Sequence, residues 1–247
     1  MIELTTMSIS IIYEDDSILA INKPAGLAVH KVSPTDPQET LADILLKNYP
    51  YLEGVGDLPA GRQGINLRPG IVHRLDKETS GLMLIAKNQK SFDHLKNLFQ
   101  THQIKKEYLA LVHGQPKEDR GTIDAPLGKL GTKQTTQIKG KKELVVRDAV
   151  TDYEVVQHYK AYPLIRVMPR TGRTHQIRVH LKHIGCPLAG DKLYASKKYL
   201  PEGLHRLFLH AWKLKLPGQN GQGLALEADL PSELSLVLQN LEQDRKG

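Results

Sequence analysis

The part of the chain that most directly offers chemistry is IVHRLDKETSGLMLIAKN, residues 71–88. It places one carboxylate, Asp76, two residues after Arg74 and just before a small polar turn that contains Gly81. A partly buried carboxylate needs a nearby cation to stay ionised. An ionised carboxylate of this kind is a candidate nucleophile or electrostatic stabiliser at the anomeric carbon of a sugar. The alternative is a loop aspartate that only caps backbone N–H groups through an Asx turn.

Glu78 offers a second carboxylate in the same loop. Two working carboxylates would indicate a glycosidase. Because Glu78 directly follows Lys77 in a polar stretch, we expect both side chains to be solvated, and we favour a single working acid.

Two long stretches of the chain contain basic residues and no acid. The whole chain has 34 Lys and Arg against 27 Asp and Glu, which gives a formal net charge of +7. Residues 155–190 carry Lys160, Arg166, Arg170, Arg173, Arg178 and Lys182. Residues 125–142 carry Lys129, Lys133, Lys139, Lys141 and Lys142. This uneven distribution favours contact with a nucleic-acid backbone, and the alternative is a solvated basic face.

Two further motifs fit a nucleic-acid ligand. In TGRTHQIR (171–178), a glycine turn enters a predicted helix between arginines, so backbone amides and guanidinium groups together suit a phosphate. The alternative is an ordinary helix start with a solvated face. In KKEYLALVHG (105–114), Tyr108 lies in an alternating, half-buried strand pattern. It is either a core tyrosine or a ring that stacks on an unpaired base.

Several other functions lack support in the sequence. His175, His180 and His183 lie on one predicted helix, but their spacing is not i, i+4 and no carboxylate is near, so a zinc site is not favoured. No P-loop, dinucleotide-binding fingerprint or nucleophile-elbow motif is present. The single cysteine, Cys186, excludes an internal disulfide and lies among apolar residues, which predicts a small buried side chain. With no signal peptide and no membrane-length apolar run, we expect a soluble cytoplasmic protein.

The hydrophobic patterns predict more strands than helices. Strands are expected at residues 8–14, 17–22, 82–87, 106–113, 150–158, 162–169, 207–216 and 224–228. Helices are expected at 40–48, 89–103 and 174–184 and after Pro231. Thr40 and Asn88 are predicted N-caps, and Phe92, Leu95 and Phe99 are predicted to form the inner face of the second helix. Residues 54–70 read as a Gly-rich loop, and residues 114–140 read as an exposed hairpin or extended loop.

Six motifs follow one another in an order that resembles the RluA family of pseudouridine synthases. They are INKPAGLAVH (21–30), GIVHRLDKETSGLMLIAKN (70–88), KKEYLALVHG (105–114), RTGRTHQIRVHL (170–181), GDKLYA (190–195) and LHAWKLKLP (209–217). The resemblance covers roughly residues 9–230, and HRLD-x-x-TSG together with RTHQIR is highly specific.

The resemblance implies an enzyme that converts chosen uridines in ribosomal or transfer RNA to pseudouridine, without cofactor or metal. Asp76 matches the family's essential aspartate, and Arg178 matches the arginine that pairs with it. Arg74 matches the arginine that enters the space left by the flipped nucleotide, and Tyr108 matches the tyrosine that packs on the target base. Asp76 would either attack C1′ or remove a sugar proton to form a glycal, and the sequence does not choose between these routes.

The sequence therefore predicts an α+β fold with a mixed, mostly antiparallel sheet, flanking helices and a central RNA-binding cleft. We expect one catalytic domain over residues 1–247, without an S4-type domain, acting as a monomer on RNA and not on DNA or a membrane. The candidate catalytic residues are Asp76, Tyr108 and Arg178, and the candidate RNA-binding residues are His73, Arg74, Arg173, Lys105 and Lys106. The alternatives are an RNA N-glycosidase, which would release free uracil, and a non-catalytic RNA-binding module.

Overall fold

The computed structural model of the chain divides into two compact units. It describes residues 9–31, 33, 35–57, 68–131, 133–138, 145–195, 200–217 and 223–246. Unit 1 comprises Met1–Ile104 and Lys213–Ala228, and unit 2 comprises Lys105–Trp212 and Asp229–Gly247. The predicted single catalytic domain over residues 1–247 stays a prediction. Within the described ranges, no helix is both long enough and apolar enough to cross a membrane.

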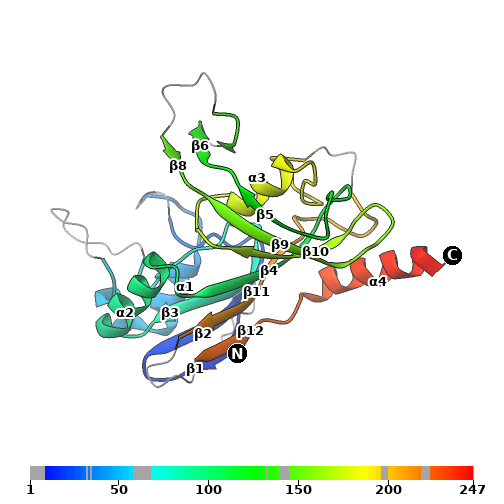
Figure 1. The fold of residues 1–247 in the computed structure, drawn as a ribbon. Coiled ribbons are helices and arrows are strands. Elements are labelled where there is room, and N and C mark those ends of the chain that lie inside the picture. Colours follow the sequence, from blue (N-terminus) through cyan, green and yellow to red (C-terminus); the bar gives the residue numbers. More distant parts are fainter. Residues whose placement is uncertain are drawn as a thin grey trace. The chain divides into compact units, whose positions relative to one another are not determined.

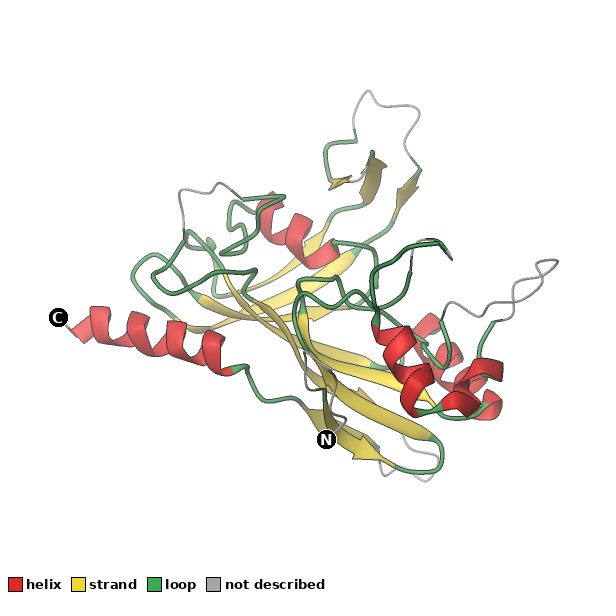
Figure 2. Cartoon of the chain, turned by 180° about the vertical axis from the view of Figure 1, so that it is seen from behind, coloured by secondary structure: helices red, strands yellow, loops and turns green. Residues whose placement is uncertain are grey.

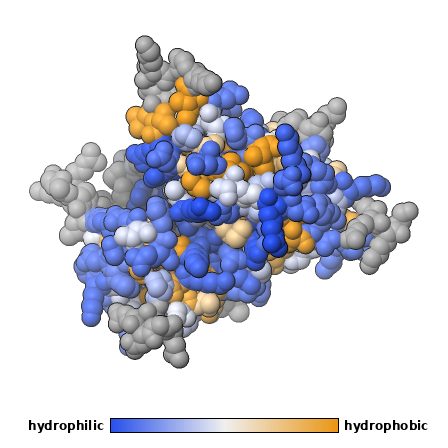
Figure 3. Space-filling model, viewed as in Figure 1, coloured by the Kyte–Doolittle hydropathy of each residue, from blue (hydrophilic) through white to orange (hydrophobic). Residues whose placement is uncertain are grey.

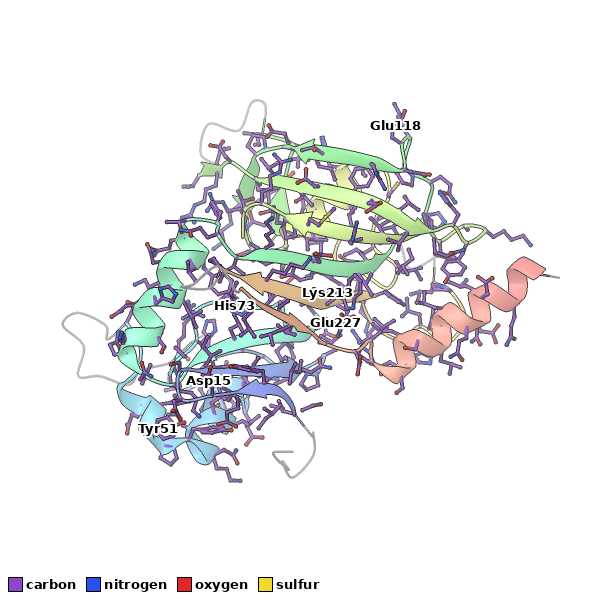
Figure 4. All side chains as sticks on the ribbon, turned by 60° about the horizontal axis from the view of Figure 1, so that its bottom comes forward. Asp15, Tyr51, His73, Glu118, Lys213 and Glu227 are labelled. Carbon is purple, nitrogen blue, oxygen red and sulfur yellow. The ribbon has the colours of Figure 1, made fainter. Side chains whose placement is uncertain are left out.

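Unit 1 contains three antiparallel strands in the order β1–β2–β3 (Figure 1). Its elements are β1 (Ser10–Glu14), β2 (Ile18–Lys23), α1 (Leu41–Asn48), the 3₁₀ helix η1 (Pro50–Gly54), β3 (Ser80–Ala86), α2 (Gln89–Gln100) and β12 (Leu224–Glu227). Strand β11 (Leu209–Leu216) begins in unit 2 and ends in unit 1, where it pairs antiparallel with β12. The Lys213 ammonium lies 3.0 Å from the Glu227 carboxylate across this hairpin (Figure 4).

Strand β3 is the buried strand on which the candidate site depends. All of its residues are buried, and Leu82–Ala86 have no exposed surface. A continuous apolar run of this length is typical of a strand that is covered on both faces. Strand β2 pairs with β3 from Ile18 opposite Ala86 to Lys23 opposite Gly81. This register puts the end of β2 beside the polar loop that leads into β3.

The predicted caps of the two helices in unit 1 are confirmed. At α1, the Thr40 side chain accepts from the Asp43 N–H, and the Asp43 carboxylate accepts from the Thr40 N–H at 2.9 Å. At α2, the Asn88 side chain accepts from the Ser91 N–H at 2.9 Å. Such caps satisfy backbone donors that the first turn leaves free, and each is worth about 1 kcal/mol. Figures 1 and 2 both show these two helices close together.

Unit 2 contains an antiparallel sheet in the order β4–β10–β9–β5 and a small sheet in the order β7–β6–β8. Its elements are β4 (Lys105–Leu111), β5 (Arg120–Asp124), β6 (Leu127–Leu130), β7 (Lys133–Thr135), β8 (Val146–Arg147), β9 (Val150–Gln157), β10 (Leu164–Pro169), α3 (Gln176–His183) and α4 (Ser232–Lys246). The predicted α+β class with mostly antiparallel pairing is confirmed.

From Tyr108 to Leu111, strand β4 is covered on both faces, although its sequence predicts a half-buried strand. Tyr108 and Ala110 belong to the hydrophobic core that includes Ile177 and Leu181 of α3. Leu109 and Leu111 belong to a second core that includes residues of α4. The alternation of side chains is therefore as predicted, but the second face is covered by a helix from the far end of the chain. A local pattern carries no information about such a partner.

The prediction for residues 114–140 is partly wrong. Strand β5 pairs with β9 along its whole length and buries Ile123, so this part is integral to the sheet. Beyond it, Leu130 and Val146 of the small sheet and Val145 just before β8 are exposed apolar side chains, and Figure 3 shows hydrophobic surface at this tip. Lys139, Lys141 and Lys142, predicted to follow a phosphate backbone, lie outside the described residues.

Candidate active site

The loop that carries Asp76 is fastened to β3 at its start. Ile71 forms an antiparallel bridge with Ile85, and the Ala86 N–H donates to the Gly70 carbonyl at 2.8 Å. Gly70 has a φ of +66°, and a Cβ atom there would lie 2.4 Å from the Ala86 oxygen. Only glycine fits this close approach without a backbone shift. At its other end the loop runs into β3 through Gly81, whose φ is +117°.

His73 adds a side-chain contact to the same attachment (Figure 4). Its Nε2 accepts the Leu84 N–H at 2.8 Å, and its ring stacks on Phe99 with centroids 4.4 Å apart. Phe92 and Leu95 are buried as predicted, Phe99 is half-buried against His73, and Leu98 is a buried residue of α2 that was not predicted. Because Nε2 is an acceptor, the ring holds its proton on Nδ1 and is neutral. The predicted contact of His73 with RNA stays a prediction.

Lys23 is a residue of this site that the sequence reasoning missed. Its side chain is completely buried, and its ammonium group donates to the carbonyls of Pro24 at 2.7 Å, Leu27 at 2.9 Å and Lys77 at 3.2 Å. The Gly26 N–H donates to the same Lys77 carbonyl at 2.8 Å. The turn after β2 is thus tied to the residue that follows Asp76. The available signal was a lysine at the end of an apolar strand, directly before a Pro–Ala–Gly turn.

Asp76 lies half-buried at the lip of this anchored loop. Its carbonyl accepts the Thr79 N–H at 3.1 Å, which closes a tight turn. Arg74, Lys77 and Glu78 are exposed, and this confirms the solvated positions predicted for the last two. The loop therefore holds one acid at the boundary between buried strand and solvent, as a carboxylate that meets a substrate requires.

In unit 2, Tyr108 is half-buried on β4 opposite Val167 of β10. It packs against the core that contains Ile177 of α3. The tyrosine ring thus has a fixed apolar support on one side, and it is available for the predicted contact with a base only through its remaining exposed surface.

The turn before α3 is held by the side chain of Gln176. Its Oε1 accepts the Arg173 N–H at 2.9 Å and the Thr171 hydroxyl at 2.8 Å. Its Nε2 donates to the Val150 carbonyl at 3.0 Å and to the Thr151 Oγ1 at 2.9 Å. The Arg173 amide, predicted to face a phosphate, is therefore occupied by Gln176. The Arg173 guanidinium donates to the Asp148 carbonyl at 3.0 Å.

His180 continues this network into the core and has no exposed surface. Its Nδ1 lies 2.9 Å from the Thr151 hydroxyl, and its Nε2 lies 2.9 Å from the Ala125 carbonyl. Burial lowers the pKa of His180, so its ring is neutral and donates from Nε2. Among the described residues, no group of three His, Cys, Asp or Glu side chains is arranged to hold a metal ion.

Arg178 forms a buried ion pair with Asp191. The Arg178 Nε and one terminal nitrogen donate to the two Asp191 oxygens, both at 2.8 Å. The Leu193 and Tyr194 N–H groups also donate to the Asp191 Oδ1, at 2.9 and 3.1 Å. Burial works to raise the pKa of Asp191, but Arg178 and the two N–H groups outweigh it, and the pKa lies below its usual value. The predicted pairing of Arg178 with Asp76 joins residues of different units and stays a prediction.

The ring of the buried Tyr194 packs against the Arg178 guanidinium. The Arg178 guanidinium lies 5.1 Å from the Tyr194 ring centroid, and the Lys182 ammonium lies 5.9 Å from it. The Tyr194 hydroxyl lies 2.8 Å from the His175 Nδ1 and accepts the Gln134 N–H of β7 at 2.9 Å. His175 has a left-handed φ of +55° at the start of α3. One ring thus joins α3, β7 and the GDKLYA segment.

Comparison with known proteins agrees with this arrangement. The family model described as RNA pseudouridylate synthase matches residues 17–183. A Bacillus subtilis protein described as uncharacterized RNA pseudouridine synthase YlyB is 36% identical over 96% of this chain and 74% of its own length. Ribosomal large subunit pseudouridine synthase D of Haemophilus ducreyi is 34% identical over 98% of this chain and 73% of its own length. The solved structure of human RNA pseudouridylate synthase domain containing 4 has a TM-score of 0.72, with 28% identity over 94% of this chain and 92% of that chain.

The chain belongs to the RNA pseudouridylate synthase family. It is an isomerase that converts uridine in RNA to pseudouridine, and RNA is its partner. The resemblance recognised in the sequence motifs is therefore confirmed at the level of the family and the reaction.

The remaining candidate residues of the synthase lie at the start of β4. Lys105 is exposed. Lys106 is half-buried, and its ammonium donates to the Thr171 carbonyl at 3.3 Å, next to Gly172. Burial lowers the pKa of Lys106 to about 8. Lys106 is therefore mostly protonated at neutral pH and loses its proton in mildly alkaline solution. The predicted contact of Lys106 with RNA stays a prediction.

Proposed function

We propose that this synthase modifies uridine in ribosomal or transfer RNA, with the large-subunit ribosomal RNA as the favoured target. Relatives named ribosomal large subunit pseudouridine synthase D, 34% to 38% identical to this chain, support the ribosomal target. The acid-free basic segments of the sequence support a phosphate-rich ligand. We also propose that the enzyme acts as a monomer in the cytoplasm, and its single buried cysteine fits a reducing compartment.

The observation that carries the catalytic assignment is the anchored loop around Asp76. The loop is fixed by glycine contact with β3 at one end and by the Lys23 ammonium just after Asp76. Burial of the Lys23 ammonium costs free energy. This cost is justified at a site where the position of one carboxylate decides the reaction rate. We therefore assign Asp76 as the catalytic carboxylate of the synthase.

The proposed reaction is defined by the bonds that break and form. The C1′–N1 glycosidic bond of uridine breaks, the uracil turns, and a C1′–C5 bond forms. The hydrogen on C5 leaves as a proton to water, and N1 takes up a proton from water, so the composition of the RNA does not change. A stacked base cannot turn, so the nucleotide first leaves the stack at a cost of about a few kcal/mol. Asp76 acts at the sugar, by attack on C1′ or by removal of a sugar proton. Tyr108 packs on the uracil and keeps it bound between the two bond events, and Arg178 keeps Asp76 ionised.

Release of tritium tests the reaction. RNA that carries tritium at C5 of uridine should release it to water during turnover, while no free uracil appears and the mass of unlabelled RNA stays constant. An RNA N-glycosidase would leave C5 untouched, so free labelled uracil with no tritium in the water would replace the proposal with that activity. If neither product forms on ribosomal or transfer RNA that binds, the protein is an RNA-binding module.

The assignment of Asp76 has a matched control in the same loop. Asp76→Asn removes the charge and keeps the shape, and we expect tritium release to fall below detection while the melting temperature changes little. Glu78→Gln makes the same chemical change at an exposed position and should keep wild-type turnover. Substantial release by Asp76→Asn, or equal loss in both variants, would contradict the assignment.

A further inference from the structure

Three side chains from separate segments of unit 1 converge near the Asp76 loop. His30 follows the turn after β2, Arg68 precedes Gly70, and Arg74 lies in the loop itself. The His30 Nε2 lies 2.8 Å from one terminal nitrogen of Arg68 and 3.5 Å from one of Arg74. Both guanidinium groups are exposed, whereas the imidazole is half-buried.

The hydrogen bonds fix the charge state of this cluster. A guanidinium group only donates, so the His30 Nε2 must accept and the ring proton must lie on Nδ1. Burial, Arg68 and Arg74 together lower the pKa of His30 to about 4. The imidazole is therefore neutral at pH 7, and the cluster carries two positive charges that the imidazole does not compensate.

The position of His30 leaves one buried ring nitrogen without a hydrogen bond among the described residues. A purely structural role does not explain this cost in free energy. Its Nδ1 is buried and has no hydrogen-bond partner in the described part of the chain. Unsatisfied buried polar atoms are uncommon in native proteins and often mark a functional constraint. The orientation that leaves Nδ1 unsatisfied is the one that presents Nε2 to the two arginines.

The two guanidinium groups repel each other, and burial together with Arg74 lowers the pKa of Arg68. Arg74 has no carboxylate within ion-pair distance in the described structure. Asp43 is already paired with Lys31, the residue after His30, at 3.1 Å. An anion placed between the two arginines would turn their repulsion into attraction.

We propose that Arg68 and Arg74, held together by His30, bind a phosphodiester group of the RNA next to the target uridine. A guanidinium fork matches two phosphate oxygens, and RNA supplies one phosphate for each nucleotide. Arg74 lies two residues from Asp76, so their Cα atoms are at most about 7 Å apart, which favours a phosphate close to the target nucleotide. The inference rests on RNA as the substrate. It adds His30 and Arg68 to the site and names the ligand of Arg74.

Binding of a defined RNA tests this site without turnover. The probe is a short synthetic hairpin with one uridine in its loop, compared with the same hairpin carrying neutral methylphosphonates on both sides of that uridine. In the wild type, the neutral linkages should weaken binding about tenfold at low salt, because a charged hydrogen-bonding pair is lost. In Arg68→Gln the native hairpin should bind about tenfold more weakly, and the methylphosphonates should add little further loss. Equal losses from the methylphosphonates in the wild type and in Arg68→Gln would overturn the proposal.

Two variants separate a specific contact from general charge. Lys90→Gln removes one exposed positive charge from α2 of the same unit and should leave the effect of the methylphosphonates unchanged. Arg68→Lys keeps the charge without the fork, so it should keep the salt dependence and lose part of the affinity. A loss of affinity in Lys90→Gln as large as in Arg68→Gln would overturn the proposal. Failure of tritium release would reject the proposed reaction but would leave the result of this binding cycle unaffected.

Discussion

Removal of the Asp191 carboxylate should destabilise the synthase strongly, because it takes away a buried partner that forms two hydrogen bonds with the Arg178 guanidinium. The two side chains are 0% and 10% exposed and are joined by two hydrogen bonds. Breaking a buried pair by removing one partner costs about 3–5 kcal/mol. For a chain of this length, about 2–4 °C are lost for each kcal/mol, so Asp191→Ala should lower the melting temperature by about 10 °C.

The effect should also depend on pH in a defined direction. The folded pKa of Asp191 is below its unfolded value, so the pair contributes its full stability above the unfolded pKa and loses it as the pH falls through the folded pKa. The difference in unfolding free energy between wild type and Asp191→Ala should therefore be constant from pH 7 to about pH 5 and narrow below about pH 4. Urea unfolding followed by circular dichroism at each pH measures it.

An exposed pair in the same unit provides the control. Arg170 donates to both oxygens of Asp152 at 2.6 and 2.8 Å, but the Arg170 side chain is 62% exposed. Asp152→Ala should cost much less than Asp191→Ala, since exposed pairs contribute little. The reasoning is refuted if the two variants lose similar stability, or if the difference for Asp191→Ala persists unchanged to pH 3.

Three other predictions follow from the same contacts. Lys23→Met removes the ammonium donor of the Pro24, Leu27 and Lys77 carbonyls, of which that of Lys77 keeps a second donor, the Gly26 N–H, so it should lower stability by about 1–3 kcal/mol and reduce tritium release; wild-type values for both would show that the Lys23 contacts are dispensable. Tyr108→Phe keeps the packing face and should keep RNA affinity in a titration, while Tyr108→Ala should lose affinity and turnover; loss of folding in Tyr108→Phe would instead make it a core residue. Replacement of the exposed Lys129 and Lys133 by Gln should flatten the log–log salt dependence of RNA binding by about 0.7 for each lost contact, and an unchanged slope would mark both as solvated.

Local signals allowed much of the fold to be predicted. Short segments of sequence determine the helix caps at Thr40 and Asn88 and the buried apolar run of β3. The structure confirms these features at the predicted positions. The second covered face of β4 and the inclusion of β5 in the sheet depend on partners distant in sequence, and were missed. At the site, motif resemblance identified Arg178 but could not reveal its pairing with Asp191. Lys23 was missed because a buried ammonium satisfied by carbonyls looks in sequence like any lysine in a turn.

The position of Tyr194 links strand β7 to the Arg178 guanidinium of α3. Its hydroxyl holds the Gln134 backbone of β7, and its ring lies under Arg178. A substitution that shifts β7 to suit another RNA therefore also shifts the surface on which the predicted catalytic cation rests. If Lys133 of β7 contacts RNA as predicted, a change of recognition made through β7 would therefore also change turnover. A series of β7 variants should show kcat and KM changing together, and variants that alter only KM would break this link.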